Sequence, residues 1–317
     1  MAIYHRSAVQ INQADMIFDL SSIWATVKEV FPYFDRLQFD WDEQYRTYLK
    51  KILQVTDEGD FHCLLTEFAE SLNDGHTKYI PPDAYRIKKQ FVRPAEPSCT
   101  MNNGVLTIKI NEFLNNYAPY VKEQLETIPN ISLVRLDVRD NIGGNTYHAA
   151  KVAELFISGT FQSCQKWTQI RNAVDTASSS QIVGYSEERI QQYINDGLLT
   201  KESIADAKST MNRTQYKEYI SCHGVEHQRA IYEGPLEILI SRNTMSAAED
   251  FVAMFKSNHR GVLIGEPTFG STGTPCIIHL RCGGRAQVVS VGYRLLDGTE
   301  FIGKGIMPDI EKERDCL

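Results

Sequence analysis

Hydrophobic residues recur with helical spacing through the first quarter of the chain. In the stretch FHCLLTEFAESL, the apolar positions fall three and four residues apart, at Phe61, Leu64, Leu65, Phe68 and Leu72. This spacing predicts a helix that buries one face, and we extend the helical region over 15–72. Asp60 is the expected N-cap. The sequence Asn73-Asp74-Gly75 then supplies a stop, so His76 falls on the loop beyond the helix.

Shorter apolar runs with strand character occupy much of the remaining chain. They are GVLTIKI (104–110), SLVRLDV (132–138), LEILIS (236–241), GVLIGEP (261–267), CIIHLRC (276–282) and AQVVSVGYRLL (286–296). Helical patterns follow the runs at 132–138 and 236–241. Because strand–turn–helix units recur, the sequence predicts an α/β core.

Residues 163–230 have a different pattern from the rest of the chain. They carry few strand signals and many polar residues, with helical stretches such as EERIQQYINDGLL. We predict a mainly helical insertion, and an insertion of this length is more often a lid or a binding element than an inert loop. The predicted organisation is an N-terminal helical region at 1–73 and an α/β core at 74–317 that contains the insertion.

Composition narrows the class of protein. Hydrophobic residues make up 42% of the 317 residues, which is enough for a sizeable core, and the net charge of −7 argues against a nucleic-acid-binding surface. No apolar run reaches the ~18 residues of a membrane span. The seven cysteines are scattered without paired spacing, and the first residues lack a leader pattern. A reducing, cytoplasmic location is therefore favoured unless a leader was removed.

Two turns that lead from a strand to a helix contain candidate functional residues. At the first, Gly143 and Gly144 follow a strand, where a glycine pair forms either a tight turn or a set of N–H donors for an oxyanion. At the second, Ser246 begins a helix, and Glu249 follows three residues later. The pair fits a capping box. A serine at a helix start also fits a nucleophile, with the oxyanion beside the N–H of Ala247.

A serine nucleophile needs a base, because its hydroxyl is inert at neutral pH. His76 is a candidate because it lies on a loop next to a helix end. A rival site is the H-x-x-E-H spacing of His223, Glu226 and His227, in which two histidines on one helix bind zinc. The glycine inside that motif weakens the helix it requires. Neither GxSxG nor GxGxxG occurs, which argues against an α/β-hydrolase elbow and a dinucleotide fold.

Taken in order, several stretches resemble the tail-specific (C-terminal processing) serine proteases and the tricorn protease core. They are IWATVKEVFPYFDRLQFDWDEQY, LNDGHTKY, LVRLDVRDNIGGN, ILISRNTMSAAEDFVAMF, GVLIGEPTFGSTG and DGTEFIGKGIMPDI. The resemblance covers nearly all of the chain outside 163–230 and implies a crotonase-like α/β core with an N-terminal helical bundle. Many relatives carry a PDZ domain after the DGHT-like segment. Here about two dozen residues separate Thr77 from Gly104, too few for such a domain.

The resemblance also implies roles for individual residues. Ser246 stands at the nucleophile position. In one branch of the family a lysine base lies 25 residues further on, but position 271 is a serine in this chain (246 + 25 = 271). His76 of the DGHT-like segment therefore takes the role of base, as in the tricorn-like branch. Ser271 and Thr77 are expected beside these groups.

The oxyanion donors and the third catalytic residue follow from the same resemblance. The N–H groups of Ala247 and of the glycine pair 143–144 are the implied donors, and Glu249 is expected to fix the turn at the nucleophile. A glutamate orients the histidine in the tricorn-like branch. Its usual position is Ile302 here, and we assign the role to Glu300, two residues earlier on the same face of an extended strand.

The sequence thus predicts a serine peptidase that uses no metal and no organic cofactor. Its partner is a peptide or an unfolded protein segment, without nucleic acid or a membrane span, and a homo-oligomer is left open. A non-catalytic module of the same fold that binds a peptide or an apolar ligand is the alternative, and the substitution at Ile302 favours it. The joint presence of Ser246, His76 and the glycine pair favours the enzyme, and a zinc hydrolase built on His223 and His227 is the least favoured reading.

Overall fold

The computed structural model describes residues 11–86, 94–168, 186–210 and 217–313. Its N-terminal part contains three helices, α1 (Gln13–Val30), α2 (Trp41–Ile52) and α3 (Glu58–Glu70), with the 3-10 turn η1 (Phe34–Arg36) after the first. The ring of Trp41 on α2 stacks on Phe68 of α3, with centroids 4.5 Å apart. The apolar stripe read from the sequence is thus the face by which these helices pack.

Helix α3 begins three residues earlier than expected. Its N-cap is Asp57, whose carboxylate accepts from the N–H groups of Gly59 and Asp60. The prediction of Asp60 as the cap was therefore wrong. The apolar stripe starts only at Phe61, and the first turn of a helix need not be apolar, so the stripe alone placed the boundary too late.

The core is a six-stranded sheet in the order β12–β8–β7–β4–β3–β2. The bounds are β2 (Ser98–Asn102), β3 (Val105–Lys109), β4 (Leu133–Asp137), β7 (Leu236–Ile240), β8 (Val262–Gly265) and β12 (Ile310–Glu311). Strands β3, β4, β7, β8 and β12 pair in parallel, and β2 pairs with β3 antiparallel. Because β4 and β7 are parallel neighbours, the loops after their carboxyl ends leave the same edge of the sheet.

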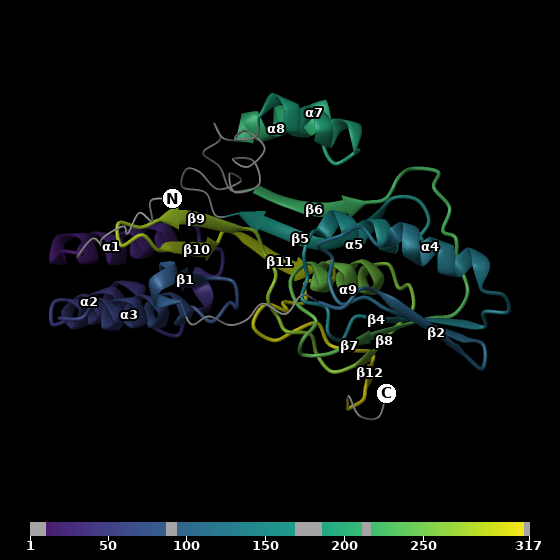
Figure 1. Ribbon diagram of the computed structural model, residues 1–317, viewed down its shortest axis with the longest axis horizontal. Coiled ribbons are helices and arrows are strands. Elements are labelled where there is room, and N and C mark those ends of the chain that lie inside the picture. The colour runs from purple at the N-terminus through teal and green to yellow at the C-terminus, as the bar shows by residue number, and fades with distance from the viewer. Residues whose placement is uncertain (1–10, 87–93, 169–185, 211–216, 314–317) are drawn as a thin grey trace, which may run out of the picture.

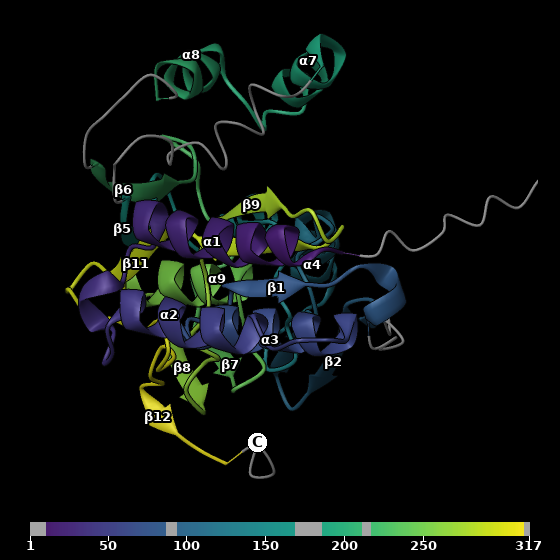
Figure 2. The same ribbon diagram turned by 90° about the vertical axis from the view of Figure 1, so that its left-hand side faces the viewer.

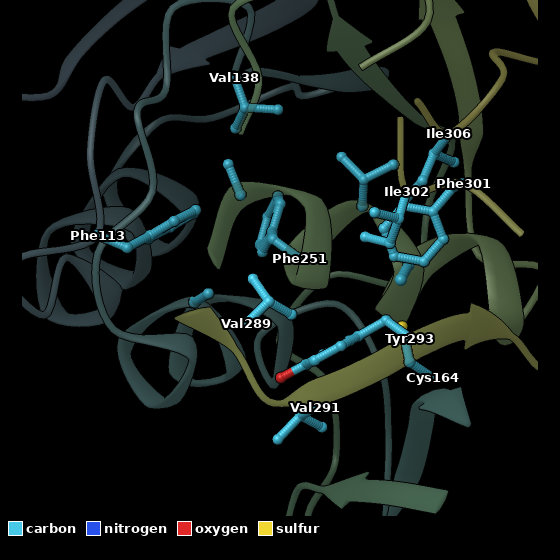
Figure 3. Close-up of a cluster of buried hydrophobic side chains, with 14 of the residues drawn as sticks. Phe113, Val138, Cys164, Phe251, Val289, Val291, Tyr293, Phe301, Ile302 and Ile306 are labelled. Carbon is cyan, nitrogen blue, oxygen red and sulfur yellow. The ribbon is translucent and has the colours of Figure 1, made fainter. Parts of the chain in front are cut away.

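Three helices lie above this sheet in Figure 1: α4 (Ala118–Thr127), α5 (Thr146–Ala153) and α9 (Ala247–Ser257). Helix α9 packs against α5, β5 (Phe161–Thr168) and β8, and its residues from Ala247 to Phe255 are all buried. A helix buried on every side holds its side chains rigidly. Figure 3 shows Phe251 of this helix among side chains from several other elements.

Two further sheets flank the core. One has the order β11–β5–β6, with β6 (Lys217–His223) and β11 (Val291–Leu295) on either side of β5. The other has the order β1–β10–β9, built from β1 (Lys78–Ile80), β9 (Pro275–His279) and β10 (Arg285–Val289), and the 3-10 turn η2 (Asp83–Tyr85) follows β1. In Figure 2 the N-terminal helices lie against this small sheet. Asp19 of α1 fastens them, because its buried carboxylate accepts from the N–H groups of Arg281 and Cys282.

The expected insertion at 163–230 contains helices α7 (Glu187–Asn195) and α8 (Lys201–Thr210), as the sequence predicted. It also includes β6 and most of β5, which the sequence analysis missed. Strand β5 reads FQSCQKWT, and its polar positions hid the alternation of buried and exposed residues. Residues 169–185 and 211–216 of the predicted insertion lie outside the described residues.

None of the helices in the described part of the chain is long and apolar enough to cross a membrane. Between Thr77 and Val105, the described residues form only β1, η2 and β2.

The cap of α3 gives a test of the local folding account. Replacing Asp57 by Ala should lower the free energy of unfolding by about 1 kcal/mol, because two N–H groups lose their acceptor. Asp60→Ala is the matched control, since Asp60 is exposed and caps nothing. Urea unfolding followed by circular dichroism measures both, and a larger loss for Asp60→Ala would contradict the assignment of the cap.

Candidate active site

Ser246 lies in the turn between β7 and α9, with a strained backbone. Its φ is 58° and its ψ is −128°, a backbone conformation that residues other than glycine rarely adopt. Such strain costs on the order of 1–3 kcal/mol and persists only where the surrounding structure imposes it. A sharp strand-to-helix turn of this kind is one way in which a fold exposes a nucleophile.

The capping box predicted at the start of α9 is present. The carboxylate of Glu249 accepts from the N–H of Ser246 at 3.3 Å. The N–H of Glu249 donates to the backbone oxygen of Ser246 at 2.7 Å.

Glu249 does more than cap the helix. Its side chain is fully buried and accepts from the Thr268 hydroxyl at 2.6 Å and from the N–H groups of Gly270 and Ser271, each at 2.7 Å. Burial raises the pKa of Glu249 to about 7, and the hydrogen bonds from these three residues oppose that rise. The carboxylate therefore ties the start of α9 to the loop at 268–271.

The glycine pair after β4 lies directly against Ser246. A Cβ placed on Gly143 would lie 2.6 Å from the Cβ of Ser246, so only glycine permits this approach. The N–H of Gly143 donates to the side chain of Asn141 at 2.9 Å and is not available to a ligand. By contrast, the N–H groups of Gly144 and Ala247 donate to no other described residue.

His76 lies on the loop between α3 and β1, as the sequence indicated, and this loop is held from several sides. The buried carboxylate of Asp74 accepts from the N–H groups of His76 and Thr77, and the Thr77 hydroxyl accepts from the N–H of Val289 at 3.0 Å. Burial lowers the pKa of His76, and the charge of Asp74 opposes that shift. A lowered pKa keeps the imidazole neutral to lower pH, as a general base requires.

Ser271 connects the two predicted catalytic residues. Its backbone oxygen accepts from the N–H of Ser246 at 2.9 Å, and its hydroxyl contacts Nδ1 of His76. No hydrogen bond joins the His76 ring to the Ser246 hydroxyl among the described residues. Ser271 is buried, so the structure places a small hydroxyl where one branch of the resembled family has a lysine.

A cavity of about 510 Å³ opens beside Ser246, and we call it the Ser246 pocket. Its lining consists of Leu114, Gly144, Asn145, Thr146, Ser246, Ala247, Asp250, Thr272, Gly273, Thr274, Pro275 and Tyr293. This volume lies in the range of ligand-binding pockets. A larger cavity of about 870 Å³ lies beside α3 and β1 and touches none of the predicted catalytic residues.

The third predicted catalytic residue is not brought to the histidine. The carboxylate of Glu300 pairs with Arg36 at 2.8 Å, and within the described chain no hydrogen bond or ion pair joins it to His76. Ile302, at the position where the resembled branch has its glutamate, is buried among apolar side chains that include Phe301 and Ile306 (Figure 3).

The rival zinc motif lacks the geometry it needs. His223 ends strand β6 and contacts the Ser163 hydroxyl through Nε2 at 2.9 Å. His227 lies in a turn with φ of 68°, and its side chain is 90% exposed. The two rings are therefore not one turn apart on a helix, and the described residues contain no group of three side chains suited to a metal ion.

Sequence reasoning missed Asp250 and Asn141. Asp250 is buried and lines the Ser246 pocket, and Asn141 positions the turn that carries the glycine pair through Gly143 and the backbone oxygen of Ile110. For Asp250 a signal existed, since it lies four residues after Ser246 and such residues share one face of a helix.

The chain is similar in sequence to known proteins. Residues 104–312 match the model of peptidase family S41, and residues 14–70 match that of the tricorn protease C1 domain. The carboxyl-terminal-processing peptidase 2 of Arabidopsis thaliana is 23% identical over 205 residues, or 64% of this chain and 30% of that protein. The carboxyl-terminal-processing protease of Synechocystis is 30% identical over 108 residues, or 34% and 24%. The chain thus spans less than a third of these curated relatives.

Solved structures share the fold over most of the chain. A protein of Parabacteroides merdae superposes with a TM-score of 0.68 at 15% identity, covering 96% of this chain and 90% of that one. The photosystem II D1 C-terminal processing protease superposes with a TM-score of 0.55 at 12% identity, covering 95% and 94%. These likenesses confirm the predicted fold class, a mixed α/β core with helices packed on a central sheet.

The raised pKa of Glu249 predicts a pH dependence of stability. Between its ordinary value of 4.5 and about 7, this carboxyl binds more protons in the folded than in the unfolded chain. The free energy of unfolding should therefore fall as pH rises through that window, on the order of 3 kcal/mol from this group. Urea unfolding at pH 4.5 to 8 measures the slope.

Two variants isolate the contribution of this one carboxyl. Glu249→Gln removes the titrating group and should flatten the slope, whereas Glu123→Gln on the surface should leave it as in the wild type. Equal slopes for the wild type and Glu249→Gln would show that Glu249 does not titrate in this range.

Proposed function

This chain belongs to peptidase family S41, and we propose on that premise that it hydrolyses peptide bonds with Ser246 as the nucleophile. The observation that carries the proposal is the strained backbone of Ser246 at the start of a buried helix, with its side chain on a cavity of about 510 Å³. The close approach of Gly143 and the loop of His76 support the same reading.

His76 is the proposed base. The Ser271 hydroxyl faces Nδ1, and if Nδ1 carries the proton, Nε2 is left with the lone pair that accepts the proton of Ser246. Burial lowers the pKa of His76 from its ordinary value of 6.5. The ring therefore stays neutral, and able to accept this proton, at pH values below 6.5 as well. The protonated ring then donates to the leaving amine, and water hydrolyses the acyl-enzyme.

Gly144 and Ala247 are the proposed oxyanion donors. Both line the Ser246 pocket, and both N–H groups are free of other described acceptors. Ala247 also begins α9, where the helix dipole favours negative charge. Gly143 has a different role in this proposal: it allows the close approach, while its own N–H stays on Asn141. The substrate is a peptide or an unfolded protein segment.

The nucleophile can be tested by covalent labelling. A fluorophosphonate probe should label the wild type, and Ser246→Ala should abolish labelling while lowering the free energy of unfolding by no more than about 1 kcal/mol. Ser98→Ala, a serine exposed on β2, is the control and should label normally. A folded wild type that takes no label, or labelling that survives in Ser246→Ala, would overturn the proposal.

Two residues are candidates for orienting His76. The hydroxyl of Ser271 contacts the His76 ring, and Glu300 is the carboxylate to which the family resemblance assigns this role. The carboxylate of Glu300 is paired with Arg36, so we assign the role to Ser271. Ser271→Ala should lower kcat about 10–100-fold, and Glu300→Gln should lower it less than about threefold. Steady-state kinetics on one peptide substrate decides between them, and the reverse order would return the role to Glu300.

A further inference from the structure

Asp250 is a buried carboxylate on the wall of the Ser246 pocket. It lies in the first turn of α9, four residues after Ser246. The residue is 3% exposed. Its two oxygens accept from the hydroxyls of Thr146 at 2.5 Å and Thr272 at 3.2 Å.

The charge of Asp250 lacks a cationic partner. Within the described residues no lysine, arginine or histidine forms an ion pair with it, and its buried neighbour Glu249 likewise accepts only from neutral donors. The ammonium of Lys166 lies 4.5 Å from the ring centroid of Tyr293 and, among the described residues, makes no ion pair with Asp250. Burying a carboxylate costs several kcal/mol unless it is paired, and two neutral hydroxyls offset only part of that cost.

The rest of the pocket suits a long side chain with a positive end. The ring of Tyr293 and the side chains of Pro275 and Leu114 give apolar walls along which the stem of a lysine or arginine can lie. In Figure 3 the Tyr293 ring lies on the same side of α9 as Val289 and Val291, on strands that close this side of the helix.

We propose that the Ser246 pocket receives a lysine or arginine side chain of the substrate, next to the bond that Ser246 attacks, and that Asp250 selects it. The inference rests on the proposed peptidase function and names the substrate class of the same site. The residue on the acyl side of the bond has the reach to set its ammonium or guanidinium against Asp250 while its carbonyl lies over Ser246. The hydroxyls of Thr146 and Thr272 hold the carboxylate in place.

Kinetics on matched peptides tests this assignment. Three fluorogenic peptides differ only at the residue before the cleaved bond, which is arginine, lysine or norleucine. Wild-type protein should cleave the arginine and lysine peptides with kcat/KM at least about tenfold above that of the norleucine peptide. Asp250→Asn keeps the shape and the threonine partners but removes the charge, and should reduce that ratio about tenfold or more, which corresponds to 1.4 kcal/mol or more.

Controls separate selection from structure. Asp309→Asn removes a surface carboxylate that pairs with Lys256, and should leave the ratio unchanged. A loss of activity that is equal for all three peptides in Asp250→Asn would show a purely structural role and overturn the inference. If Asp250→Asn does not fold, the inference is tested instead by how well a product peptide protects the wild type from labelling by the fluorophosphonate probe. A product peptide ending in arginine should protect at a concentration at least about tenfold lower than one ending in norleucine, and equal protection overturns the inference.

The labelling result distinguishes a failure of this inference from a failure of the proposed peptidase function. If the wild-type protein takes the label at Ser246 but shows no preference for a basic residue, the proposed peptidase function stands and this inference is overturned. Wild-type protein that neither takes the label nor cleaves any of the three peptides overturns both.

Discussion

The carboxylate of Glu249 is buried between two segments of the chain, and the geometry around Ser246 depends on it. Four donors converge on its two oxygens: the N–H groups of Ser246, Gly270 and Ser271, and the hydroxyl of Thr268. Because an unsatisfied buried carboxylate is costly, these contacts hold the start of α9 and the loop at 268–271 in a single arrangement. That arrangement sets the backbone oxygen of Ser271 on Ser246 and its hydroxyl on His76. Groups far apart in sequence are thereby fixed relative to one another.

The topology of the sheet brings the other half of the site into place. Strands β4 and β7 are parallel neighbours, so the turns after them emerge side by side. One turn carries Gly143 and the other carries Ser246, and the absence of a side chain on Gly143 lets the two backbones meet. The same crossing leaves the N–H groups of Gly144 and Ala247 on the wall of one pocket. Strain at Ser246 is maintained because α9 is buried on every side and cannot relax.

Much of this could be read from the sequence, and the failures have physical causes. Strands such as β4 and β7 follow apolar runs bounded by turn residues, and the position of Ser246 at a helix start follows from the S-x-x-E spacing. Strand β5 was missed because its glutamines and serine obscure the alternation. The partner of Glu300 could not be foreseen, since Arg36 lies more than 260 residues away in the chain. Local spacing carries information about elements, whereas contacts between distant segments depend on how the elements pack.

The structure also explains why the predicted zinc motif was misleading. His223 and His227 have the spacing of a zinc motif, but β6 ends at His223 and the chain then turns, so the spacing no longer corresponds to one helical face. The Ser246 pocket instead gathers its groups from α9, the loop after β4 and the loop before β9. Two of its features, the N–H pair and the carboxylate of Asp250, are complementary to opposite charges. A substrate with a developing oxyanion and a basic side chain would satisfy both.

The most direct test of the account is a crystal structure of the protein with a peptide boronate or fluorophosphonate bound. We expect the boron or phosphorus to be bonded to the Oγ of Ser246, with one oxygen 2.7–3.1 Å from the N–H groups of Gly144 and Ala247. A nitrogen of His76 should lie within hydrogen-bond reach of the Ser246 oxygen. An adduct on another residue, or an oxygen that faces away from these two N–H groups, would contradict the claim that this crossing is the catalytic centre.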